Sequence, residues 1–170
     1  FLPAAARQVV PDPLLFGWSW PLFGVAGALS TLAAGQLADR WSDRDIWIGS
    51  YVVMALGIAL PAFDAGLGAL FLSSLAAGGS FLVITMTALR EAQAVAGAAA
   101  PELIAAMTAA FAVGQCLGPL AAGYLLELEG SFAPALLAAA TLLLGSAAIL
   151  TLEAHRSRAI PAVRERRPWP

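Results

Sequence analysis

The feature that most constrains the fold of this chain is a series of long segments without charged residues. The first of them runs from Leu14 to Leu37. As an α-helix it would be about 36 Å long at 1.5 Å per residue. The hydrocarbon core of a bilayer is about 30 Å thick, so this segment is long enough to span it with some tilt. Four further apolar segments follow, and together they predict an all-α, polytopic transmembrane helix bundle.

The overall composition agrees with this prediction. Apolar residues make up 60% of the chain and charged residues 12%, whereas about 25% of residues are charged in soluble domains. The mean hydropathy is +0.81. These values exclude an ordinary soluble globular domain, and the net charge of −2 carries no information about partners.

Breaks between the apolar segments set the expected helix boundaries. We expect five full spans, at residues 14–37, 46–63, 66–89, 102–126 and 132–152. A helix stub at Phe1–Val10 precedes them, a small-residue linker follows Arg90-Glu91, and an Arg-rich, disordered tail occupies residues 153–170. Residues suited to capping or starting a helix stand before the spans: Asp12 with Pro13, Ser42 with Asp45, Asp64, Pro101 and Ser131.

The arginines predict the orientation in the membrane. Lysine is absent, and if the five spans alternate, eight of the nine arginines fall on one face: Arg40, Arg44, Arg90, Arg156, Arg158, Arg164, Arg166 and Arg167. Only Arg7 falls on the other. Because positively charged loops stay in the cytoplasm, we expect the loop at 39–45 and the C-terminal tail to be cytoplasmic, in an inner or plasma membrane.

Charge is concentrated in the loop between the first two spans. Asp39, Arg40, Asp43, Arg44 and Asp45 are five of the twenty charged residues of the chain. Since a charge at the bilayer centre costs about 2.5–3.5 kcal/mol on insertion scales, this loop must lie in water or among headgroups. The simplest interpretation is a solvated cytoplasmic connector.

A second interpretation comes from the spacing Gly35-x-x-x-Asp39-Arg40-x-x-x-Arg44. It resembles the cytoplasmic loop signature of the major facilitator superfamily (MFS) of transporters. That resemblance implies a gating role, in which Asp39 meets the N-terminus of a helix from the other half of the transporter, worth about 0.3–1 kcal/mol. Asp39 also stands at the unfavourable end of its own helix dipole, so we expect a partner for it, either such a helix or an arginine such as Arg90.

Two further sequences support the resemblance. Gly114-x-x-x-Gly118-Pro119 is similar to a helix signature of the same superfamily, although plain helix packing explains it equally well. Phe1-Leu2-Pro3-Ala4 and Val83-Ile84-Thr85-Met86 resemble the YbfB/YjiJ-type branch. The five spans then correspond to helices eight to twelve of an MFS transporter, and Phe1–Val10 to the end of helix seven.

Polar and small residues within the spans indicate which helices face the interior. The first, third and fourth spans carry most of them, so we expect the second and fifth to face lipid. Candidate cavity-lining residues are Ser80, Thr85, Thr108 and Gln115. For Gln115, contact with a polar substrate and an interhelical hydrogen bond are equally good interpretations. Gly78-Gly79 indicates close helix packing rather than a phosphate-binding loop, and Trp18 and Trp20 are typical interfacial anchors.

The chain offers no catalytic or metal-binding pattern. Its one histidine, His155, lies near the C-terminus, and Cys116 has no histidine near it in sequence. We therefore expect no enzyme activity, cofactor, metal or nucleic acid. The resemblance implies a secondary transporter that moves a small solute by alternating access. Its partners would be the lipid bilayer, the substrate and the N-terminal half of the same transporter. The alternative is a non-transporting membrane scaffold or anchor subunit.

Overall fold

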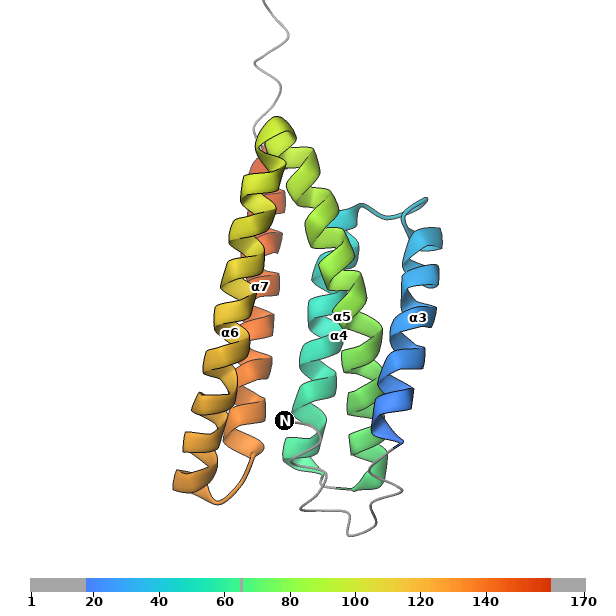
Figure 1. Ribbon diagram of the computed structural model, residues 1–170. Helices are drawn as coiled ribbons and strands as arrows, with labels where there is room; N and C mark the ends of the chain where they lie inside the picture. Colours follow the sequence, from blue (N-terminus) through green and yellow to red (C-terminus); the bar gives the residue numbers. More distant parts are fainter. Residues whose placement is uncertain (1–17, 65, 160–170) are drawn as a thin grey trace, which may run out of the picture.

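The computed structural model of this chain describes residues 18–64 and 66–159, all of the regular structure being helical. The elements in chain order are α3 (Ser19–Leu37), α4 (Asp43–Phe63), α5 (Leu67–Ala96), the short 3₁₀ helix η1 (Gly97–Ala99), α6 (Ala100–Glu129) and α7 (Ala133–Ala159) (Figure 1).

The helices run alongside one another (Figure 1). α5 packs against both α3 and α4, and α4 also packs extensively against α7. A short turn joins α6 to α7, and the two helices form a hairpin. α5 and α6 meet at η1 and diverge toward the opposite end of the bundle, and α6 has few contacts with either α5 or α7.

Three helical stretches are long and apolar enough to cross a membrane within the described ranges: Asp43–Phe63, Leu67–Glu129 and Ala133–His155. The middle stretch contains both α5 and α6, each of 30 residues. A helix of that length is about 45 Å long, so each of the two exceeds the hydrocarbon core. The all-helical class is therefore confirmed, and three apolar stretches, rather than five separate ones, have the length and composition of membrane spans.

Several expected helix starts are confirmed. Ser42 is the N-cap of α4, and its Oγ accepts a hydrogen bond from the Asp45 backbone N–H. Pro101 lies in the first turn of α6. Ser131 Oγ accepts a hydrogen bond from the backbone N–H of Ala133, where α7 begins. The proposed cap at Asp12 and Pro13 lies outside the described residues, as does the stub at Phe1–Val10.

The expected cap at Asp64 is wrong. Asp64 ends α4, and the N-cap of α5 is Gly66. The carboxylate Oδ1 of Asp64 accepts a hydrogen bond from the Gly66 backbone N–H at 2.8 Å. The side chain of Asp64 thus bonds to the backbone two residues on, in a turn that aspartate often forms. It forms no hydrogen bond that caps α5.

The expected linker after Glu91 is also wrong. α5 continues to Ala96, η1 follows directly, and α6 begins at Ala100. Alanine is the best helix former, so this alanine-rich stretch stays helical. The chain reverses at Gly97, whose φ of 53° suits glycine and few other residues. α7 likewise extends past residue 152 to Ala159.

The central helix of the described bundle is α5. It contributes the largest set of buried residues, whereas only Ala100 and Ala122 are buried on α6. The expectation that the third span is interior is therefore confirmed. The same expectation for the fourth span is not met in this part of the chain, because α6 has few contacts with its described neighbours.

Candidate functional site

The charged loop is a tight turn that continues the last turn of α3. The backbone N–H groups of Arg40 and Trp41 both donate to the carbonyl oxygen of Leu37, each at 2.9 Å. Asp39 and Arg40 are exposed, and no described residue forms a salt bridge with Asp39. This geometry holds the Asp39 carboxylate outside the bundle, at the end where η1 also lies (Figure 1).

The start of α4 is fixed by a capping interaction. Besides accepting from the Asp45 N–H at 3.1 Å, Ser42 Oγ donates to the Asp45 carboxylate at 2.7 Å. Asp43 and Asp45 both lie in the first turn of α4. Acidic residues in a first turn are favourable because they face the positive end of the helix dipole. The loop is thus ordered on its α4 side.

Two ion pairs join this first turn of α4 to the last third of α5. Arg44 pairs with Glu91, and Arg90 pairs with Asp43 at 3.4 Å. The side chains of the first pair are 25% and 23% exposed, and those of the second 44% and 31%. An exposed pair is worth about 0–1 kcal/mol, so the more buried Arg44–Glu91 pair should contribute more.

This pairing differs from the expected one. Arg90 was one of the partners expected for Asp39, but it binds Asp43. The sequence contained the signal, because Asp43-Arg44 and Arg90-Glu91 are charge dipeptides of opposite order at the ends of two consecutive apolar helices. Because consecutive helices of a hairpin run antiparallel, the start of α4 lies beside the end of α5.

A row of aromatic rings crosses the bundle from α3 to α6. Ring centroids lie 6.2 Å apart for Trp20 and Phe23, 6.3 Å for Phe23 and Phe81, and 6.0 Å for Phe81 and Phe111. These separations are typical of favourable aromatic pairs. The row connects α3, α5 and α6, and the sequence analysis missed it because no local spacing identifies it.

Three of the four candidate cavity residues belong to the helix faces that carry this row. Thr85 is four residues from Phe81 on α5, while Thr108 and Gln115 are three and four residues from Phe111 on α6. All three are exposed in the described structure. The hydroxyl of Thr85 donates to the Phe81 carbonyl oxygen, and that of Thr108 donates to the Ile104 carbonyl oxygen. Each hydroxyl is therefore hydrogen-bonded within its own helix.

Ser80 lies elsewhere. It is buried, its hydroxyl donates to the Ala76 carbonyl oxygen at 2.7 Å, and it lines a cavity of about 380 Å³ among α3, α4 and α5. The structure therefore groups Thr85, Thr108 and Gln115 and separates Ser80 from them.

The glycine–proline sequence of α6 has no close partner among the described helices. A Cβ atom at Gly114 or Gly118 would meet nothing within 4 Å, and the same holds for Gly35 on α3. Pro119 lies inside α6, which continues through it. No described residue therefore packs closely against these glycines, and their role in helix packing stays a prediction.

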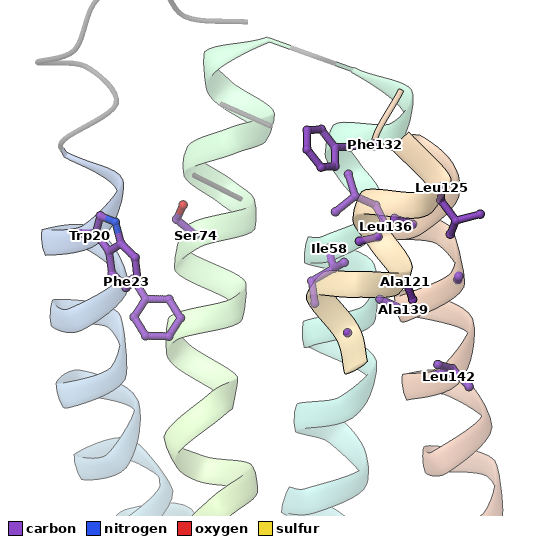
Figure 2. A pocket seen from close by; sticks show the side chains of 14 residues that line it. Trp20, Phe23, Ile58, Ser74, Ala121, Leu125, Phe132, Leu136, Ala139 and Leu142 are labelled. Atoms are coloured by element: carbon purple, nitrogen blue, oxygen red, sulfur yellow. The ribbon is translucent and has the colours of Figure 1, made fainter. Parts of the chain in front are cut away.

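A larger cavity of about 450 Å³ is lined by residues of α3, α4, α5, α6 and α7, and we call it the interhelical groove. Trp20 and Phe23 form one wall, and Phe132, Leu136 and Leu142 lie on the other side (Figure 2). Small residues of α6 and α7 complete its lining. Its lining residues Trp20 and Phe132 lie next to the starts of α3 and α7, at the end of the bundle opposite the charged loop.

A comparison with protein families decides the identity of the fold. The family model described as "Uncharacterised MFS-type transporter YbfB" matches residues 1–151. The chain belongs to this family of MFS transporters. No curated protein and no solved structure matches the chain.

The match to the YbfB-type family covers every candidate residue of the site. The loop from Gly35 to Arg44, the aromatic row and the Gly114–Pro119 sequence all lie between residues 1 and 151. Within the described part of the chain, no three His, Cys, Asp or Glu side chains are arranged to hold a metal ion. The site thus consists of a charged loop at one end of the bundle and a helix face that combines aromatic and hydroxyl or amide side chains.

Proposed function

We propose that this chain is part of a secondary transporter that moves a small solute across the membrane by alternating access. The observation that carries the proposal is the YbfB-type MFS family match over residues 1–151. In MFS transporters two six-helix halves enclose a substrate site near the midplane. The chain supplies most of one such half, with five spans.

In this proposal the charged loop is part of the gate that closes the cytoplasmic side of the transporter. The Asp39 carboxylate is exposed at the same end of the bundle as Arg44, Arg90 and η1. That clustering of arginines supports a cytoplasmic location for this end and for the C-terminal tail. A carboxylate held outside the bundle is available to the N-terminus of a helix in the other half, with which it closes the cytoplasmic side.

The solute-facing surface lies on α5 and α6. Thr85, Thr108 and Gln115 combine hydroxyl and amide groups with the rings of Phe81 and Phe111. Ligand sites in proteins are typically apolar with a few polar groups that orient the ligand. Gln115 lies near the middle of α6 and is the residue we assign to polar recognition.

Two-sided labelling tests the proposal without knowledge of the substrate. In the full-length protein, with Cys116→Ser, the variant Gln115→Cys is treated with a membrane-impermeant maleimide in right-side-out and in inverted vesicles. A transporter exposes this position to each side for part of the time, so both preparations are labelled. The matched control is Thr141→Cys, on α7, which we expect to face lipid and to remain unlabelled. A scaffold or anchor subunit would leave Gln115→Cys unlabelled, or labelled from one fixed side, and that result would refute the transport proposal.

A further inference from the structure

We propose that the solute-facing surface of α5 and α6 recognises an organic amine, that is, a solute with an amino group beside an apolar body. The inference rests on the proposed transport function and names the chemical class of its substrate. Three features of the surface carry it: a backbone carbonyl group that lacks its helical donor, hydroxyl groups whose protons are already used, and aromatic rings without a charged residue near them in sequence.

The backbone of α6 presents an acceptor at Gln115. In a regular α-helix the carbonyl oxygen of residue 115 accepts a hydrogen bond from the N–H of residue 119. That residue is Pro119, which lies inside the helix and has no N–H. The Gln115 carbonyl oxygen therefore lacks its helical donor.

The same carbonyl group is also poorly covered by side chains. A helical side chain leans over the turn that precedes it, so a side chain at position 118 would shield the carbonyl oxygen of Gln115. Position 118 is a glycine, and a Cβ atom there would meet nothing within 4 Å. Gly118 and Pro119 together leave this acceptor open to a solute.

The two hydroxyl groups of the surface act as acceptors too. A threonine hydroxyl has one proton and two lone pairs. The proton of Thr85 is donated to the Phe81 carbonyl oxygen at 3.0 Å, and that of Thr108 to the Ile104 carbonyl oxygen at 2.8 Å. Only the Gln115 side-chain amide can both donate and accept. Acceptors therefore predominate, and a solute that donates hydrogen bonds is matched better than one that only accepts them.

The charge distribution favours a cationic amine over an anion. No charged residue occurs between residues 67 and 89 of α5 or between residues 103 and 126 of α6, so these segments offer no arginine to a carboxylate or phosphate. The faces of Phe81 and Phe111, whose centroids lie 6.0 Å apart, carry partial negative charge and attract cations. The rings also provide apolar area for the body of the solute.

Protection of a cysteine from labelling tests this chemical class with two matched probes. In the purified full-length protein with Cys116→Ser, the reporter is Ala112→Cys, which is exposed and lies one helical turn before Gln115. It is labelled with a methanethiosulfonate reagent in the presence of 2-phenylethylamine or of 3-phenylpropanoate. The probes share the ring and have opposite charges at neutral pH. Ser42→Cys, exposed on the charged loop, is the control for effects of the probes on the reagent itself.

We expect the amine to slow labelling of Ala112→Cys at concentrations at which the carboxylate does not, and neither probe to change labelling of Ser42→Cys. Equal or stronger protection by 3-phenylpropanoate, or no protection by the amine, would overturn the proposal.

The role of the carbonyl group is tested by restoring its helical donor. Pro119→Ala supplies the missing N–H, so the amine loses one acceptor, and its half-protecting concentration should rise about tenfold. Pro61→Ala is the matched control, because it makes the same replacement inside α4, away from this surface. An unchanged value for Pro119→Ala, or an equal rise for Pro61→Ala, would overturn the assignment.

A second variant pair covers the case in which Pro119→Ala does not fold. Gly118→Leu places a side chain over the Gln115 carbonyl group, whereas Gly123→Leu adds the same side chain at another open position of α6. Only the first should weaken protection by the amine, and equal protection in the two variants would overturn the assignment.

Failure of this inference is distinguishable from failure of the transport proposal. Labelling of Gln115→Cys from one fixed side refutes transport whatever the probes do. Labelling from both sides, combined with protection by the carboxylate, leaves transport in place and shows that the solute is not an amine.

Discussion

Gly78 on α5 lies directly against the backbone of Phe23 on α3. A Cβ atom added to Gly78 would stand 2.8 Å from the Phe23 Cα and would also overlap its carbonyl oxygen. Gly27, one turn further along α3, faces the carbonyl oxygen of Gly78 in the same way, at 3.3 Å from an added Cβ. The two helices therefore touch through backbone atoms, an approach that only glycine permits.

The first prediction follows from this contact. Gly78→Ala should destabilise the protein by about 1–3 kcal/mol, because overpacking against rigid backbone forces the helices apart. Gly79→Ala is the matched control: its nearest neighbour would be the Ser30 Cβ at 3.9 Å. Alanine favours a helix over glycine by about 1 kcal/mol, so the control should be neutral or stabilising. Thermal unfolding of the two purified variants measures the difference, and equal melting temperatures would show that α3 and α5 are not in contact at Gly78.

The second prediction concerns the ion pair between Arg44 and Glu91. Arg44→Gln and Glu91→Gln should each lower the free energy of unfolding by about 1 kcal/mol or less. The exchanged pair Arg44→Glu with Glu91→Arg should recover part of that loss. Arg40→Gln is the control, since Arg40 is exposed on the same loop and forms no ion pair with a described residue. A double-mutant cycle with zero coupling energy would contradict the pairing.

The third prediction concerns orientation. Cysteine at Ser42 should react with an impermeant reagent only from the cytoplasmic side, and cysteine at Gly130 only from the opposite side. Both positions are exposed, and they lie at opposite ends of the bundle. Labelling of intact cells in a Cys116→Ser background distinguishes them. If Ser42→Cys reacts in intact cells and Gly130→Cys does not, the topology is the opposite of the one proposed.

Local sequence patterns predicted those parts of the structure that neighbouring residues determine. The cap formed by Ser42 and the start of α6 at Pro101 were correct because both depend on bonds or geometry within one helical turn. Close packing at Gly78 was also correct as a general interpretation, since two adjacent glycines in an apolar helix favour it. The partner of Gly78 was beyond reach, because it depends on which helices are neighbours.

The errors have the same origin. Asp64 satisfied the local pattern of an N-cap, but its carboxylate binds the Gly66 N–H within a turn. Residues 92–100 were assigned to a linker because the charged pair Arg90-Glu91 ends the apolar segment, whereas the helix propensity of alanine prevailed. Among the site residues, helical spacing relates Thr85 to Phe81 and Thr108 and Gln115 to Phe111, but only the fold shows that Phe81 and Phe111 are in contact.

The fourth prediction compares two polar residues on the helices of the hairpin. Gln115→Leu on α6 should reduce transport once a substrate is known, because it removes the amide that we assign to recognition. Thr141→Leu on α7 should have little effect: Thr141 is exposed, and its hydroxyl only donates to the Leu137 carbonyl oxygen. Uptake by cells that express equal amounts of each variant is the measurement. Equal tolerance at both positions would remove Gln115 from the proposed solute-facing surface.

The fifth prediction returns to Asp39. Its carboxylate follows the last turn of α3, where it opposes the negative end of that helix dipole at a cost of a few tenths of a kcal/mol to about 1 kcal/mol. Arg90 does not compensate this cost, because it pairs with Asp43. Under the proposed function the partner comes from the other half of the transporter, and the interaction forms only when the cytoplasmic side closes. Asp39→Asn keeps the size of the side chain and removes its charge.

In the full-length protein this substitution should therefore weaken cytoplasmic closure while expression persists. Loss of up to about 1 kcal/mol from the closed state multiplies the inward-open to inward-closed ratio by about five. Labelling of Thr108→Cys, which lies on the half of α6 nearer the charged loop, should increase accordingly from the cytoplasmic side. Arg40→Gln is the control for a general change in the loop, because it leaves the carboxylate in place. If Asp39→Asn alters neither this labelling nor uptake, the loop is only a solvated connector and the gate lies elsewhere.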